Sequence, residues 1–303
     1  MSPLRGILLM IASVTLFTVM SAMIKAAVRI PPGEAVFFRS VVTIPAMLIW
    51  FGLRGQLREA LGTRNGWGHA RRGIIGTVAM GLGFAGLKFL PLPEVTALQF
   101  ATPIFTLIFA AFMLGERFRL IRAAAVLAGL VGVVIILWPR LTIEGNQAEL
   151  IGATLVLAAA GCAALAQIFV KRMTGTEAPT AIVFYFAVTA TSLSLLTLPF
   201  GWVLPQGIEW VWMIGAGVVG LGGQILLTAS YRHAEVSVLA PFTYVAMIWS
   251  LLFGWFFFAE APTPQILGGA ALVIASGVVI FLRERQLGLR RAAEAKLRAK
   301  GMQ

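Results

Sequence analysis

The stretch Gly6-Ile-Leu-Leu-Met-Ile-Ala-Ser-Val-Thr-Leu-Phe-Thr-Val-Met-Ser-Ala-Met-Ile24 carries no charge from end to end and stops at Lys25. Its length matches the roughly 20 apolar residues that a helix needs to cross a bilayer core about 30 Å thick. Similar runs continue along the chain. Since 59% of the 303 residues are hydrophobic and 12% are charged, a water-soluble fold would leave too much apolar surface exposed. The sequence therefore predicts an all-α membrane protein.

Ten apolar runs of this kind each predict one transmembrane helix. They cover residues 6–24, 35–53, 73–90, 95–115, 123–138, 150–170, 180–199, 210–230, 236–259 and 265–282. The second run is unusual because Arg39 interrupts it. Ten spans use about 200 residues, so the connecting loops are short and a second, soluble domain is not expected.

The basic residues are divided unevenly between the two sides of the bilayer. Ten spans place both termini on one side, which also holds 19 of the 24 lysines and arginines; four lie on the other side, and Arg39 lies within a span. Positive charge accumulates on the cytoplasmic side, so both termini are expected in the cytoplasm, with the chain in a bacterial inner membrane. The basic tail, residues 285–303, is expected to lie on anionic lipids, or to be a solvated anchor without a function of its own.

The inventory of reactive residues excludes several classes of function. Cys162 is the single cysteine and His69 and His233 are the only histidines, so neither an internal disulfide nor a metal site is expected. The phosphate-binding motif Gly-x-x-x-x-Gly-Lys-Ser/Thr is missing, so the chain is not expected to hydrolyse ATP. The net charge of +12 lies in loops and the tail rather than on a soluble basic face, which argues against nucleic-acid binding. No cofactor and no catalytic residue are predicted, and the chain is not expected to be an enzyme.

The two halves of the chain repeat the same landmarks in the same order, at offsets of 141 to 146 residues. The matching pairs are Lys25 and Lys171, Glu94-Val-Thr-Ala-Leu98 and Glu235-Val-Ser-Val-Leu239, Glu116 and Glu260, and Gly132-Val-Val-Ile-Ile-Leu137 and Gly277-Val-Val-Ile-Phe-Leu282. This pattern predicts two five-helix repeats, residues 4–143 and 147–284. Since five is odd, the second repeat enters the membrane from the opposite side. Such inverted repeats are the structural basis of alternating access.

Several short motifs accompany these repeats: Pro32-Gly-Glu-Ala-Val-Phe-Phe-Arg39, Pro103, Leu114-Gly115-Glu116, Ala240-Pro-Phe-Thr-Tyr244 and Phe258-Ala259-Glu260. Together with the span count they make the chain resemble the EamA-type, ten-helix members of the drug/metabolite transporter superfamily, over about residues 4–284. The resemblance implies a cavity lined by helices 1, 3, 4, 6, 8 and 9, with helices 5 and 10 more peripheral. The resemblance does not identify the substrate, because close relatives are assigned to amino acids, riboflavin, S-adenosylmethionine and metallophores.

Polar side chains inside spans are costly, so each needs a partner, a cavity or a role. The residues predicted to bind substrate are Lys25, Arg39, Gln99, Gln167, Lys171, Gln224, Tyr244 and Trp249. Simpler interpretations stay open: the glutamines can join helices by hydrogen bonds, and the two lysines can reach the interfaces. Arg39 could pair with Glu34, at an imperfect spacing of five residues, or attract an anion near the outer gate.

The leading hypothesis is a secondary active transporter that moves a small amphipathic organic metabolite, such as riboflavin or an amino acid, by alternating access. The alternatives are transport of S-adenosylmethionine or a metallophore, and a passive channel. An intramembrane enzyme would need a nucleophile–base pair or metal ligands, which this sequence does not offer. The expected partners are the small-molecule substrate and the lipid bilayer, and the chain is expected to be a monomer or a homodimer.

Overall fold

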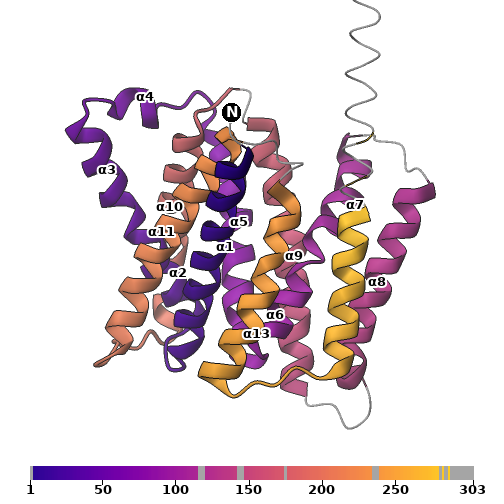
Figure 1. Cartoon of the computed structure of the whole chain (residues 1–303). Helices are drawn as coiled ribbons and strands as arrows, with labels where there is room; N and C mark the ends of the chain where they lie inside the picture. The colour runs from indigo at the N-terminus through magenta and orange to yellow at the C-terminus, as the bar shows by residue number, and fades with distance from the viewer. Residues whose placement is uncertain are drawn as a thin grey trace, which may run out of the picture.

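The computed structural model describes residues 3–114, 120–141, 147–173, 176–233 and 239–279, together with residues 282 and 286. Within these ranges all regular structure is helical, and the helices run up and down beside one another (Figure 1). Among the described residues, four helices are long and apolar enough to cross a membrane, namely Leu4–Ala26, Pro32–Leu53, Gln147–Val170 and Glu209–Leu227. Shorter apolar helices accompany them: Leu127–Ile136, Pro179–Leu195, Phe242–Phe258 and Pro264–Val279. The predicted fold class, an all-helical chain with membrane-spanning segments, is thereby supported.

The helices follow one another with short connections. Their bounds are α1 Pro3–Ala26, α2 Pro32–Val41, α3 Thr43–Leu53, α4 Leu57–Leu61, α5 Gly66–Phe89, α6 Leu92–Gln99, α7 Thr102–Leu114, α8 Leu120–Leu141, α9 Gln147–Met173, α10 Pro179–Leu195, η1 Leu198–Phe200, α11 Glu209–His233, η2 Ala240–Tyr244 and α13 Val245–Phe258. Several helices continue beyond the charged residue at which the apolar run stops. The largest extension is at the start of α5, which Asn65 caps by accepting a hydrogen bond from the backbone N–H of Gly68.

Two runs that the sequence predicts as single helices are broken in the structure. The run 35–53 is divided between α2 and α3, and the run 95–115 between α6 and α7. A proline removes the backbone donor for the carbonyl four residues earlier and its ring collides with that carbonyl. Pro45 acts in this way on Val41, where α2 ends, and Pro103 acts on Gln99, where α6 ends. These breaks therefore lie where the positions of the two prolines predict them.

The main helix contacts join segments that are far apart in the sequence. The most extensive are those of α1 with α11 and of α5 with α9. The helix Pro264–Val279 packs against α8 at the edge of the bundle, where Gly132 and Gly269 let the two backbones touch. Figure 1 shows α1 beginning at the top of the bundle. We call that end the N-terminal face, and the other end, where α1 finishes, the opposite face.

Candidate functional site

A cavity of about 440 Å³ lies between α5, α6, α7, α9 and η2, and we call it the central cavity. Its volume falls within the range of about 300–1,000 Å³ that is typical of small-molecule sites. The polar side chains among its described lining residues are Thr96, Gln99, Thr102, Gln167, Thr243 and Tyr244, and none of these is charged. Alanines, Met80, Phe100 and Pro103 supply the apolar walls. The cavity can therefore hold an amphipathic molecule through amide and hydroxyl hydrogen bonds.

The helix break before Pro103 shapes one wall of this cavity. Because Pro103 cannot donate to the carbonyl of Gln99, the hydroxyl of Thr102 donates to that oxygen instead, at 2.7 Å. The interrupted backbone thus stays hydrogen-bonded, as the membrane interior requires. Phe100, which lies in the break, meets the ring of Tyr244 edge-on with centroids 5.1 Å apart. Gly277 leaves room for the Tyr244 hydroxyl, because a side chain there would collide with it.

Of the residues predicted from sequence, the central cavity brings together Gln99, Gln167 and Tyr244. Trp249 is not among its lining residues; it stacks on Phe253 with centroids 6.0 Å apart. The backbone of Lys171 belongs to α9, one turn after Gln167, but its side chain lies outside the described residues.

Lys25 lies at the opposite face and is not among the residues that line the central cavity. Its ammonium forms a 2.8 Å ion pair with Glu260. The same ammonium donates to the backbone oxygen of Leu90 at 2.7 Å and to that of Leu87 at 3.3 Å. These carbonyls end α5, where the helix leaves backbone acceptors without partners and its dipole favours a cation. The pair therefore ties the end of α1 to the ends of α5 and α13.

The backbone at the end of α13 places Glu260 for this contact. Ala259 adopts a left-handed conformation with φ of 53°, and the N–H of Glu260 donates to the carbonyl of Gly254 at 2.9 Å. This is a common helix ending, although glycine usually occupies the left-handed position. The second carboxylate oxygen of Glu260 accepts from the N–H of Leu92, at 2.8 Å. Glu260 therefore also holds the start of α6, and we call Lys25 and Glu260 the opposite-face lock.

The possible pairing of Arg39 with Glu34 is wrong. Glu34 accepts a hydrogen bond from the backbone N–H of Val203 at 3.0 Å. The guanidinium of Arg39 points elsewhere and lies over the ring of Phe186, 5.7 Å from its centroid. The two residues are five positions apart on α2, which directs their side chains to different sides of the helix.

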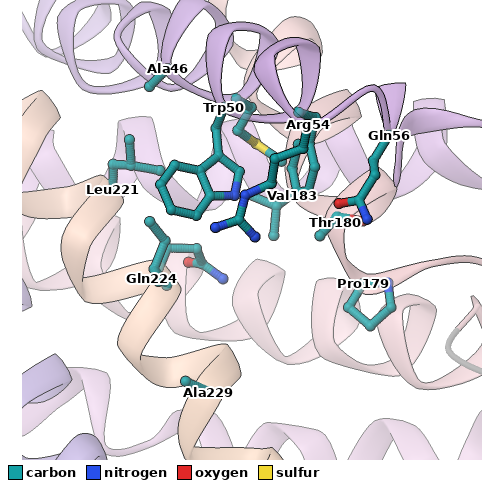
Figure 2. A pocket seen from close by; sticks show the side chains of 13 residues that line it. Ala46, Trp50, Arg54, Gln56, Pro179, Thr180, Val183, Leu221, Gln224 and Ala229 are labelled. Atoms are coloured by element: carbon teal, nitrogen blue, oxygen red, sulfur yellow. The ribbon is translucent and has the colours of Figure 1, made fainter. Parts of the chain in front are cut away.

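A second pocket, of about 710 Å³, lies between α3, α10 and α11. Figure 2 shows the indole of Trp50 and the guanidinium of Arg54 entering it from α3, with Gln224 of α11 facing them. Arg54 stacks on Trp50 at 4.1 Å from the ring centroid. Trp50 and Ile225 are both more than half exposed, so this pocket is a groove on the outside of the bundle. Gln224 therefore lies apart from the central cavity.

A buried histidine and a buried glutamate meet at the N-terminal face. His69 Nε2 lies 3.1 Å from a carboxylate oxygen of Glu177, and both side chains are almost fully buried. The other carboxylate oxygen accepts from the backbone N–H of Arg64, at 3.1 Å. Burial acts to raise the pKa of Glu177, but the hydrogen bonds from His69 and from the Arg64 backbone hold that pKa below its usual value. The pair links the start of α5 to the connection between α9 and α10.

We expect Glu177→Gln to lower the stability of the protein by about 1–3 kcal/mol, because it leaves buried hydrogen-bonding groups poorly matched. The folded-state pKa of Glu177 is lowered, so its contribution is present above the unfolded pKa of about 4.3 and is lost as the pH falls through the folded value. Thermal unfolding of the wild type and the variant should therefore converge on acidification. Glu59→Gln, at an exposed position of α4, is the control. A difference that persists unchanged at pH 3 would contradict this account.

A family of known proteins matches two parts of the chain. The EamA-like transporter family matches twice, at residues 4–138 and at residues 150–282. The chain belongs to this family. Its members form part of the drug/metabolite transporter superfamily, so the resemblance inferred from the sequence is confirmed. The protein is accordingly a transporter and not an enzyme.

Curated relatives of this EamA-family protein carry different substrates. The pseudopaline exporter of Pseudomonas aeruginosa is 28% identical over 280 residues, which cover 91% of this chain and 95% of the relative. The S-adenosylmethionine uptake transporter of Rickettsia prowazekii is 28% identical over 250 residues, covering 82% and 81%. The riboflavin transporter of Vibrio cholerae is 27% identical over 280 residues, covering 90% and 92%. These names cover both export and uptake.

A solved crystal structure has the same fold. It superposes with a TM-score of 0.65 at 22% sequence identity, and the match covers 92% of this chain and 98% of the other.

Sequence reasoning missed two features that shape the interior of this transporter. Arg72 is assigned from sequence to a cytoplasmic loop, but it belongs to α5 and its guanidinium lies 3.8 Å from the centroid of the Phe186 ring. The cap residue Asn65, followed by no proline before residue 90, is the signal that could have placed it in a helix. The pairing of Lys25 with Glu260 was also missed, because nothing local connects residues so far apart.

Proposed function

We propose that this protein is a secondary active transporter that moves a small amphipathic organic metabolite by alternating access through the central cavity. A vitamin such as riboflavin, an amino acid or a related compound is the expected substrate class. The observation that carries the proposal is the set of uncharged polar groups, Gln99, Gln167 and Tyr244, around a cavity of about 440 Å³. Such a lining suits a neutral or anionic amphipathic molecule better than a polycation.

The arrangement of helices supports two inverted five-helix repeats, which together make ten spans. The contact of α1 with α11 joins the first helix of one repeat to the third of the other, and the contact of α5 with α9 is its counterpart. The broken fourth span, α6 and α7, corresponds in the same way to η2 and α13. Inverted pairs of this kind support a rocking motion around a shared site.

The orientation proposed from the charges places the N-terminal face in the cytoplasm. The residues near this face include Arg54, Arg58 and Arg64, whereas the opposite face carries Arg29 and its 3.6 Å partner Glu209. The positive-inside rule favours this orientation. Impermeant thiol reagents applied to intact cells should label a cysteine at the exposed Gln147 but not one at the exposed Arg64. Labelling at Arg64 but not at Gln147 would mean that the opposite face, and not the N-terminal face, lies in the cytoplasm.

S-adenosylmethionine and metallophores remain alternative substrates. Relatives at similar identity are named a pseudopaline exporter and an S-adenosylmethionine uptake transporter. A passive channel is the alternative from a different functional class. The opposite-face lock argues against it, because a partly buried ion pair bound to three backbone groups closes one end of the bundle. A channel would also pass solute at a rate that does not saturate and would show no exchange across the membrane.

The test of function begins with purified protein and a thermal-shift screen of vitamins, amino acids and nucleosides, because a bound ligand raises the unfolding midpoint. The compound found is then measured in liposomes without ATP, where we expect saturable uptake that a trapped excess of the same compound accelerates. Gln99→Ala and Gln167→Ala should each raise KM about tenfold, the value of one lost hydrogen bond of roughly 1.4 kcal/mol. Gln224→Ala, which alters the outer groove, should leave KM near the wild-type value. Uptake that does not saturate and is not accelerated by trapped compound would show that the protein is a passive channel and not a secondary active transporter.

A further inference from the structure

Two arginines meet on one aromatic ring in the interior of the bundle. The guanidinium carbon of Arg72 lies 3.8 Å from the centroid of Phe186, and that of Arg39 lies 5.7 Å from the same centroid. The three residues come from α5, α2 and α10, which pack against one another. Phe186 is near the middle of α10. The two positive charges are therefore close neighbours well inside the protein.

A glycine one turn along α5 makes room for the guanidinium of Arg72. A Cβ atom at Gly76 would lie 2.9 Å from Nη1 of Arg72 and 3.0 Å from the Phe186 ring. Gly220, on α11, borders Arg39, because a Cβ atom there would be in ordinary contact with Nε at 3.5 Å. Arg39 is only 7% exposed. We call Arg39, Arg72 and Phe186 the arginine pair site.

Neither arginine has an acidic partner in the part of the chain that the structure describes. Nε of Arg39 and both Nε and Nη1 of Arg72 are buried without a hydrogen-bond partner there. Two buried acids are engaged elsewhere, Glu34 with the backbone of Val203 and Glu177 with His69. A ring face contributes about 2 kcal/mol or somewhat more to one desolvated cation. Two like charges that share one ring remain poorly compensated, since burying an ion costs several kcal/mol.

We propose that the arginine pair site binds an anion, namely a carboxylate or a phosphate-type oxyanion. Guanidinium groups present several fixed N–H donors that match the oxygens of these anions, and the resulting hydrogen bonds are charge-assisted. A single anion between Arg39 and Arg72 would satisfy donors on both and remove their mutual repulsion. The anion is either free in solution or carried by the transported molecule.

The geometry of α5 supports the second of these sources, in which the anion is a group on the transported molecule. Arg72 and Ala79, which lines the central cavity, are seven residues apart and therefore lie on the same side of the helix. At about 1.5 Å per residue they are separated by roughly 10 Å. A molecule of ordinary metabolite length could place its body in the central cavity and its acidic group at the arginine pair site. This second source, unlike the anion site itself, rests on the proposed transport function.

The first experiment measures the thermal unfolding midpoint of the purified full-length protein in sodium HEPES. Sodium phosphate, sodium acetate and sodium chloride are titrated separately at constant sodium concentration. We expect phosphate or acetate to raise the wild-type midpoint saturably by about 3 °C or more, and Arg72→Gln to abolish this rise. Arg71→Gln, the exposed neighbour that lies over Trp67, should keep it. Arg39→Gln is the second test variant, so the result does not depend on one substitution folding well.

Two results would overturn the proposal: no anion raises the wild-type midpoint, or the rise persists in both Arg39→Gln and Arg72→Gln. Neither requires transport, so a failed transport assay and a failed anion site are distinguishable. The source is then assigned by comparing the binding of riboflavin and flavin mononucleotide, which differ by one phosphate. A preference of about tenfold or more for the phosphorylated compound, lost in Arg72→Gln, assigns the anion to the transported molecule. Equal binding of the two compounds assigns the site to a free anion.

Discussion

Replacing Gly269 by alanine is expected to destabilise the protein by about 2–3 kcal/mol, the largest effect on stability anticipated for a single added methyl group. A Cβ atom at this position would lie 2.8 Å from the carbonyl oxygen of Gly132 and 3.1 Å from the backbone nitrogen of Ile136. Both contacts are with backbone of α8, which cannot turn aside as a flexible side chain would. The helix Pro264–Val279 would have to move away from α8 along its length.

The adjacent Gly268 supplies a matched control. A Cβ atom there meets nothing within 4 Å, and alanine is the better helix former by about 0.5–1 kcal/mol. Gly268→Ala should therefore leave the thermal midpoint unchanged or raise it slightly. The two variants are compared in the same detergent at one heating rate. Equal midpoints for Gly268→Ala and Gly269→Ala would show that α8 and Pro264–Val279 are not packed as described.

The second large effect is expected at the opposite-face lock. Lys25→Gln removes an ion pair whose side chains are 12% and 16% exposed, and it weakens the hold on the carbonyls that end α5. We expect these contacts to stabilise only the conformation in which this face is closed, so the variant destabilises that conformation. A differential contribution of about 1.4 kcal/mol changes the ratio of the two access states roughly tenfold, while the fold is retained.

The repeat pattern assigns Lys171 as the counterpart of Lys25 at the N-terminal face. Lys171→Gln should therefore shift the ratio of access states in the opposite direction, with transport altered in both variants. Arg29→Gln is the control, because its pair with Glu209 is longer, at 3.6 Å, and nearly half exposed on the arginine side, and such pairs contribute little. Wild-type transport in both lysine variants would mean that the two lysines only anchor their helices at the membrane interfaces.

The apolar runs were sufficient to predict helices, because burial in hydrocarbon allows few alternatives for the backbone. They were less informative about where each helix bends or begins. Pro45 and Pro103 indicate where the two helices break, but the hydropathy pattern alone predicted one continuous helix in each case. Arg72 was misplaced because a charge was taken to end a span, although a long side chain can remain inside a helix when it finds an aromatic ring.

The candidate site was only partly accessible to sequence reasoning. Gln99, Gln167 and Tyr244 were predicted from the cost of polar groups in spans, and the structure brings them together. The same argument grouped Gln224 with them, although it faces the outer groove. Helical periodicity shows which residues share a side of a helix but not which neighbour that side meets. The contact of Lys25 with Glu260 depends on how the two halves assemble, and no local pattern encodes it.

Alternating access through the central cavity is tested most directly by the accessibility of a cysteine placed in it. Ala163, which lines the cavity, is replaced by cysteine in a Cys162→Ala background, and an impermeant thiol reagent is applied to each side of oriented membrane vesicles. We predict slow labelling from the opposite face when Lys25 is present. In Lys25→Gln that labelling should become about tenfold faster, with a corresponding fall in labelling from the N-terminal face. Equal labelling from both faces, unaffected by Lys25→Gln, would mean a passage open at both ends and would contradict the account.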